Sequence, residues 1–123
     1  MSDQTLSHAE RLRSLGVIRR LFERGESGFV YPFRYLFFAE ACDVPTAKVL
    51  FSVPKKYHKR ANKRNLLRRR TKEAYRLNKQ LLSASKHPAA MDLALIYTTK
   101  DVTDYKKIEQ SVRKILQQVV ERL

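Results

Sequence analysis

The chain has 123 residues, 43% of them hydrophobic, and its 26 Lys and Arg against 12 Asp and Glu give a net charge of +14. This length is typical of one domain with its own core. The single cysteine, Cys42, excludes an intrachain disulfide and a cysteine-based zinc cluster. The apolar runs are too short to span a bilayer, and the polar N-terminus lacks the apolar region of a signal peptide. We therefore expect a cytoplasmic protein that binds a polyanion.

The hydrophobic pattern predicts an α+β fold with three helices on a single sheet of three to four strands, in the order α-β-β-β-α-β-α. Residues 1–10 are expected to form a disordered tail, and 11–123 a single domain. The first helix is predicted to start at Ser14 as N-cap and to run to Arg24, with Gly25 as the C′ residue that stops it. The remaining elements are predicted as a short strand within 26–32, strands at 33–39, 47–53 and 91–97, a helix at 62–82, and a final helix capped by Thr103 or Asp104.

The segment 55–79, KKYHKRANKRNLLRRRTKEAYRLNK, holds most of the charge, with twelve Lys and Arg against one acid, Glu73. On a helical wheel, Leu66, Leu67, Ala74 and Leu77 form the predicted core stripe. The polar side chains that gather opposite this stripe are Asn65, Arg68, Arg69, Lys72, Arg76 and Lys79.

Arg70 is the exception, because the wheel places it within the apolar stripe. Either its side chain reaches past the edge of the core, or the helix is rotated from this wheel.

A ribbon of cations on one helix face favours nucleic acid as the partner. A solvated helix face normally mixes acids with bases, and a membrane-surface helix carries bulkier apolar residues. Arginine donates bidentately to phosphate, and the amide of Asn65 suits 2′-hydroxyls and base edges. A rigid ribbon backed by a sheet suggests docking to structured RNA, and His58 is expected to contact phosphate. DNA binding is disfavoured, because no second helix orients the ribbon in a groove.

The sequence gives no sign that the chain catalyses a reaction alone. A protein nuclease would need clustered carboxylates for metal ions or paired histidines for proton transfer. The three histidines fall in the N-terminal segment and two predicted loops, and no acidic pair has suitable spacing. We therefore expect neither catalytic residues nor a metal site in the protein.

Four stretches in a fixed order follow the third predicted strand: Lys55-Lys56, Arg64-Asn65, Arg68-Arg69, and Lys72-Glu73-Ala74-Tyr75-Arg76. In order and spacing they resemble the basic motif of the protein subunit of bacterial ribonuclease P, and the order of elements extends the resemblance over nearly the whole chain. The chain departs from the motif in three places. Leu66 stands where an arginine usually closes an Arg-Asn-Arg core, Lys72 replaces an arginine, and the preceding loop is longer and lacks its usual glycine.

The resemblance implies that the domain of residues 11–123 binds RNA, namely the ribonuclease P RNA and the 5′ leader of precursor tRNA, and promotes 5′-end maturation of tRNA. The chemistry would belong to the RNA with magnesium, while the protein alone binds no cofactor, membrane or small-molecule substrate. A left-handed strand–helix–strand crossover is also implied, against the usual handedness.

The resemblance and the charge pattern together give two sets of expected site residues. The RNA-binding set is Lys55, Lys56, Arg60, Lys63, Arg64, Asn65, Arg68, Arg69, Lys72 and Arg76. The set implied for a leader-binding cleft between the first helix and the sheet is Phe22, Phe33 and Tyr35, since exposed aromatic rings can stack on single-stranded bases.

The composition also fits a different class, a non-catalytic RNA-binding protein such as a small ribosomal protein. Ribosomal proteins more often carry long basic extensions, and both ends of this chain are unremarkable in charge. The spaced motif and the aromatic residues favour the ribonuclease P interpretation.

Overall fold

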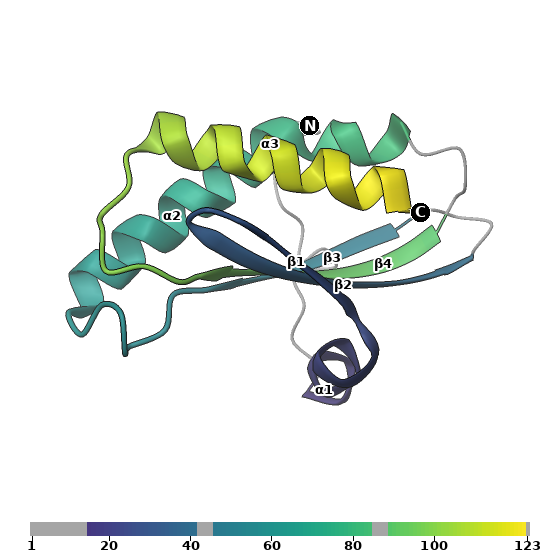
Figure 1. Cartoon of the computed structure of the whole chain (residues 1–123), viewed down its shortest axis with the longest axis horizontal. Helices are drawn as coiled ribbons and strands as arrows, with labels where there is room; N and C mark the ends of the chain where they lie inside the picture. The colour runs from purple at the N-terminus through teal and green to yellow at the C-terminus, as the bar shows by residue number, and fades with distance from the viewer. Residues whose placement is uncertain (1–14, 42–45, 85–88, 123) are drawn as a thin grey trace, which may run out of the picture.

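A computed structural model of the chain describes residues 15–41, 46–84 and 89–122 (Figure 1). The predicted tail at 1–10, the Ser14 cap and Cys42 lie outside these residues. The elements in chain order are α1 (Leu15–Arg24), β1 (Glu26–Val30), β2 (Phe33–Ala41), β3 (Thr46–Ser52), α2 (Ala61–Asn78), the 3₁₀ helix η2 (Lys79–Ala84), β4 (Ala89–Tyr97) and α3 (Tyr105–Arg122). The predicted α+β class is confirmed, including the short strand before Pro32.

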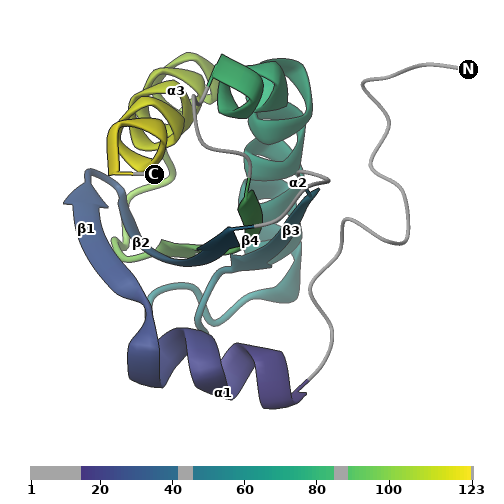
Figure 2. The same cartoon turned by 90° about the vertical axis from the view of Figure 1, so that its right-hand side faces the viewer.

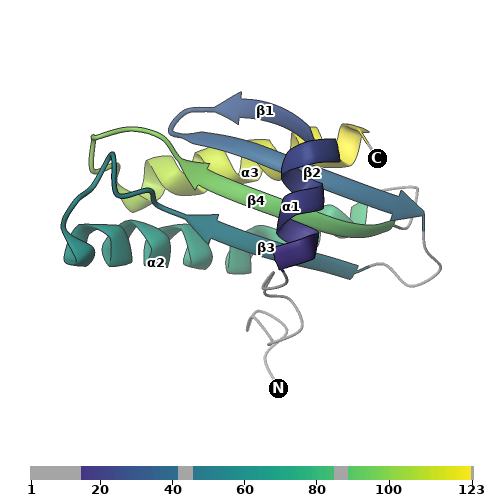
Figure 3. The ribbon, with the colours of Figure 1, turned by 90° about the horizontal axis from the view of Figure 1, so that it is seen from below.

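The four strands form one sheet in the order β1-β2-β4-β3, in which only the β3–β4 pair is parallel. Helices α2 and α3 lie side by side on one face, and α1 crosses the other face (Figure 2). Viewed from the α1 side, β3 and β4 both point to the left, β4 lies above β3, and α2 connects them behind the sheet (Figure 3). This path makes the β3–α2–β4 crossover left-handed, as the resemblance implies.

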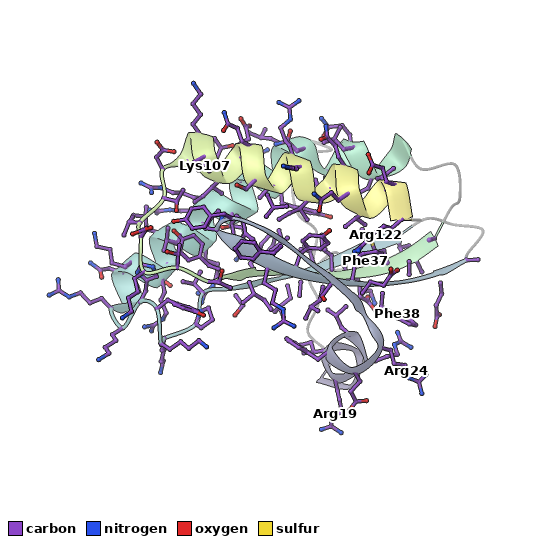
Figure 4. The ribbon with its side chains drawn as sticks, viewed as in Figure 1. Arg19, Arg24, Phe37, Phe38, Lys107 and Arg122 are labelled. Atoms are coloured by element: carbon purple, nitrogen blue, oxygen red, sulfur yellow. The ribbon has the colours of Figure 1, made fainter. Side chains whose placement is uncertain are left out.

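The main core lies between the sheet and the pair α2 and α3. Alternation along β2 sends Phe33, Tyr35 and Phe37 into this core, where each is 1% exposed. The neighbouring Phe38 points to the opposite face, towards α1 (Figure 4). A smaller cluster of Leu21, Leu36 and Ala94 fixes α1 to that face. Burial of a leucine such as Leu21, which is 0% exposed, contributes about 1.5–3 kcal/mol.

Helix α2 buries a different stripe from the predicted one. Leu67 and Ala74 are buried as predicted, but Leu66 and Leu77 are only half-buried. The buried polar side chains are satisfied within the helix, since Thr71 Oγ1 donates to Leu67 O and Asn78 Nδ2 donates to Ala74 O, each at 2.8 Å. The wheel was rotated because it assumed that α2 packs on the sheet alone, whereas α2 also packs against α3.

The same rotation explains Arg70. Its Nη1 donates to the backbone oxygen of Thr103 at 2.8 Å, so this half-buried side chain joins α2 to the loop before α3. Helix α3 is capped by Asp104, whose Oδ1 accepts from the amide of Lys107 at 2.9 Å. One of the two predicted caps is therefore confirmed, and the Thr103 hydroxyl bonds instead to Tyr97 Oη at 2.6 Å.

Gly28 in β1 permits close contact between the first strand and the core. A Cβ at this position would lie 2.4 Å from the ring and hydroxyl of Tyr35 on the paired strand. The Tyr35 hydroxyl in turn donates to Gln118 Oε1 of α3 at 2.7 Å. The ring of Tyr35 is thus enclosed between β1 and α3.

Candidate nucleic-acid interface

The loop between β3 and α2 is held in place by His58, which is 7% exposed. Its Nε2 lies 2.9 Å from the backbone oxygen of Thr99, and its ring centre lies 5.6 Å from that of Tyr97. The expectation that His58 contacts phosphate is therefore wrong, because the ring is turned into the protein. His58 positions the loop, and the loop presents the exposed Lys55 and Lys56 to solvent.

Arg64 braces the same loop from the first turn of α2. Its Nη1 donates to the backbone oxygens of His58, at 3.0 Å, and of Lys59, at 2.7 Å. Two of the five guanidinium donors are used in this way, which leaves Nη2 and Nε at a half-buried position beside the loop. Arg64 therefore has a structural role, and its contact with RNA stays a prediction.

The start of α2 gains positive charge from its backbone as well as from the lysines and arginines around it. Arg60 precedes the helix without giving it a side-chain cap, and the first turn contains no acidic residue. By contrast, α3 has its Asp104 cap. A helix N-terminus carries partial positive charge and amide groups without helical partners, which suit an anion such as phosphate. In α2 one of these amides, that of Lys63, donates to Asn62 Oδ1 at 2.9 Å. The exposed Lys59 and Lys63 flank this end.

The outer face of α2 continues the positive charge. Asn65 and Arg69 are exposed, and Arg68 Nη1 donates to Asn65 Oδ1 at 3.3 Å. Arg76 differs, because Nε donates to Glu73 Oε2 at 3.0 Å and Nη2 donates to Oε1. The hydrogen bond from Arg76 lowers the pKa of Glu73. The part of the helix with the least competition for an external anion is therefore its first half.

The structure brings all ten predicted RNA-binding residues together on the 55–60 loop and α2, which we call the basic surface. The exposed members are Lys55, Lys56, Arg60, Lys63, Asn65 and Arg69, and the half-buried members are Arg64, Arg68, Lys72 and Arg76. Their contact with RNA stays a prediction.

The placement of Phe33 and Tyr35 in a leader-binding cleft is wrong. Both side chains are 1% exposed and face α2 and α3, while α1 lies on the opposite side of the sheet. Strand β2 carries apolar residues on both faces, so its alternation left two possible orientations. The structure turns Arg34, Leu36 and Phe38 towards the α1 side.

Phe22 does lie on the surface, with 54% of its area exposed. On one flank of α1, Arg20 approaches Asp92 at 3.5 Å and lies over the ring of Phe38 at 4.9 Å. Phe22 comes two residues later, about 200° further round the helix, and so lies on the opposite flank. The sheet extends beyond α1 on both sides (Figure 3). Since Arg20 lies towards the start of β4, the flank with Phe22 is the one towards the end of β4 and the start of β2.

The uncovered part of the sheet carries a second exposed aromatic residue that the sequence did not single out. Phe29 on β1 is 60% exposed and pairs with the exposed Arg34, which in turn pairs with Ile96 on β4. We call Phe22, Phe29, Arg34 and Ile96 the open sheet surface. Phe29 was missed because β1 is a five-residue edge strand, too short to show from sequence which side chains face the core. The signal that could have found it is Gly28, because a glycine indicates the face that lies close to its neighbours.

The described residues contain neither a cluster of metal ligands nor a membrane-spanning helix. Across 15–41, 46–84 and 89–122, no three His, Cys, Asp or Glu side chains gather closely enough to hold a metal ion. Within the same ranges, no helix has the length and apolar character needed to cross a membrane.

Comparisons with known proteins agree on one family. The family model described as Ribonuclease P matches residues 6–120. A ribonuclease P protein component of Porphyromonas gingivalis is 33% identical over 114 residues, which cover 90% of this chain and 83% of the relative.

Among solved structures, the RNase P protein of Thermotoga maritima matches with a TM-score of 0.71 and 24% identity, over 89% of this chain and 96% of that one. A Staphylococcus aureus RNase P protein matches with a TM-score of 0.72 and 20% identity, over 90% and 88% of the two chains. These likenesses show the shared fold. Together with the family model and the bacterial relative, they show that this chain belongs to the family of ribonuclease P protein components.

Proposed function

We propose that this chain binds ribonuclease P RNA through the basic surface and the 5′ leader of precursor tRNA through the open sheet surface. The family role is that of the protein component of an RNA-based endoribonuclease that matures the 5′ end of tRNA. In this proposal magnesium is held by the RNA subunit, the protein contributes binding energy alone, and the complex acts in the cytoplasm.

The observation that carries the proposal is the combination at the start of α2. Exposed cations, a helix N-terminus without a side-chain cap, and a loop anchored by His58 all meet there. Because the loop backbone is already held by His58 and Arg64, its cations bind without the cost of ordering the loop, so more of the phosphate attraction contributes to affinity. Each phosphate neutralised by such a cation makes binding more dependent on salt.

The leader proposal rests on the two exposed aromatic residues beside a cation. Phe22 and Phe29 are more than half exposed, and Arg34 lies between Phe29 and β4 in the sheet. Stacking on aromatic rings contributes about 1–3 kcal/mol per base without regard to sequence. This property suits a leader whose sequence differs from one precursor to another. The end of β1 and the start of β2, which carry Phe29 and Arg34, lie at the same end of the molecule as the start of α2 (Figure 3).

The experiment that tests the basic surface is equilibrium binding of a bacterial ribonuclease P RNA over a salt series. We expect the double variant Lys55→Gln/Lys56→Gln to weaken binding and to lower the slope of log K against log salt by about two units. Arg19→Gln/Arg24→Gln is the matched control, because it removes the same charge from exposed positions of α1 (Figure 4). Equal slopes for the two double variants would contradict the proposed interface.

A further inference from the structure

The outer face of α3 carries a second group of cations, apart from the basic surface. Lys106, Lys107, Arg113 and Lys114 are all exposed. On a helical wheel they fall within an arc of about 120°, opposite the buried stripe of the same helix. The exposed Gln110 and Gln117 lie inside the arc, and Glu121 marks its C-terminal limit.

Among the described residues no salt bridge joins these four cations to an acid, and the nearby Asp104 accepts a backbone amide as the cap of α3. Glu109 stands between the two pairs in sequence, but it is half-buried and lies within 3.5 Å of the Tyr105 hydroxyl. In the described part of the chain, neither Lys106 nor Arg113 forms a salt bridge with it. An ordinary solvated helix face pairs acids with bases at three- or four-residue spacing. The outer face of α3 therefore presents positive charge to an external anion.

The side chains on this face indicate which polyanion it suits. The exposed residues in the arc are Lys, Arg and Gln, which donate hydrogen bonds to phosphate, and none is aromatic. A face without aromatic rings offers little stacking on bases, beyond the guanidinium of Arg113, in contrast to the open sheet surface. The two cation pairs stand seven residues apart, about 10 Å along a rigid helix. Fixed spacing and the absence of stacking favour the backbone of a double helix, which RNA-binding proteins recognise by shape.

The position of α3 makes such a contact compatible with the basic surface. Helices α2 and α3 lie side by side on the same face of the sheet, so a folded RNA bound to one can extend over the other (Figures 1 and 2). The cation at the C-terminal end of α3 lies against the sheet, because the guanidinium of Arg122 lies 5.8 Å from the centre of the Phe37 ring (Figure 4). The candidate contact is thus confined to residues 106–117.

We infer that the outer face of α3 is a second contact site for the sugar-phosphate backbone of double-helical RNA, formed by Lys106, Lys107, Arg113 and Lys114. The inference rests on the proposed function, since the ribonuclease P RNA would supply the duplex.

Two double variants test it, Lys106→Gln/Lys107→Gln and Arg113→Gln/Lys114→Gln. Each variant replaces exposed cations with glutamine, which is also a good helix former, and a thermal melt checks that the fold is retained. In the salt series with a bacterial ribonuclease P RNA, we expect each to lower the slope by about two units. We also expect each to weaken binding of a blunt-ended RNA duplex more than binding of a single strand of the same length.

The outcomes separate this site from the basic surface. An unchanged slope in both α3 variants would overturn the second contact, and it would leave the proposed function intact if Lys55→Gln/Lys56→Gln still lowered the slope. A loss no larger than that of Arg19→Gln/Arg24→Gln would show an effect of net charge alone and would also overturn it. The second contact would likewise be overturned if the α3 variants lost more binding to the single strand than to the duplex.

Discussion

His58 and Thr99 join the two loops that precede α2 and α3, with Nε2 of the imidazole 2.9 Å from the carbonyl oxygen. Arg70, in the third turn of α2, also bonds to the loop before α3, through the backbone oxygen of Thr103. The hydroxyl of Tyr97 bonds to Thr103 from the sheet below. These contacts hold the N-terminal parts of α2 and α3 together at one end of the molecule.

The first prediction concerns His58→Ala. Loss of a buried hydrogen bond and of ring packing should lower the free energy of unfolding by about 1–3 kcal/mol. RNA affinity should fall because the loop loosens, but the salt slope should stay the same, since His58 contacts no phosphate. Thermal melting and the salt series measure the two effects. A slope lower by about one unit would return His58 to the interface.

The adjacent pair Arg69 and Arg70 gives a matched comparison on one helix turn. Arg69 is exposed, so Arg69→Ala should leave the melting temperature almost unchanged while lowering the salt slope for ribonuclease P RNA by about one unit. Arg70→Ala should lower the melting temperature, because the backbone oxygen of Thr103 loses its partner. The assignment of roles would be reversed if Arg70→Ala changed the slope and Arg69→Ala changed the melt.

The open sheet surface predicts a dependence on the leader. Phe22→Ala and Phe29→Ala should each weaken the holoenzyme's binding of precursor tRNA by about 1–3 kcal/mol and leave mature tRNA unaffected. Val102→Ala is the control, because it shortens another exposed apolar side chain in the loop before α3. Equal losses with precursor and mature tRNA would remove the aromatic pair from leader binding.

Tyr35→Ala should behave differently from those two variants. The ring is enclosed between Gly28 and α3, so its removal leaves a cavity that costs about 3–5 kcal/mol of stability. A variant that melted like the parent but bound the leader poorly would restore Tyr35 to the cleft.

The Glu73–Arg76 pair predicts a pH dependence. The hydrogen bond from Arg76 lowers the pKa of Glu73 from its ordinary value of 4.5. Such a carboxylate stabilises the fold above its unfolded pKa, and the contribution is lost as the pH falls through the lowered, folded value. The side chain is 45% exposed, so the effect is small. Glu73→Gln should lower the melting temperature slightly at neutral pH and have no effect in acid below the folded pKa. A difference that persisted there would need another cause.

The sequence predicted the order of elements and the location of the basic surface, because both follow from periodicity and charge along one segment. It did not predict the rotation of α2, since α2 packs against α3 as well as the sheet, and only the tertiary fold defines the position of α3. It also misplaced Phe33 and Tyr35, because a strand with apolar residues on both faces does not reveal which face meets which helix. Phe29 depends on the register of β1 against β2, which five residues do not specify.

The most direct test of the account is cleavage of precursor tRNA by a bacterial ribonuclease P RNA at low magnesium, with and without this protein. The account predicts that the protein stimulates cleavage at the correct 5′ site and that the protein alone cleaves nothing. Tight RNA binding without stimulation, or cleavage by the protein alone, would contradict it.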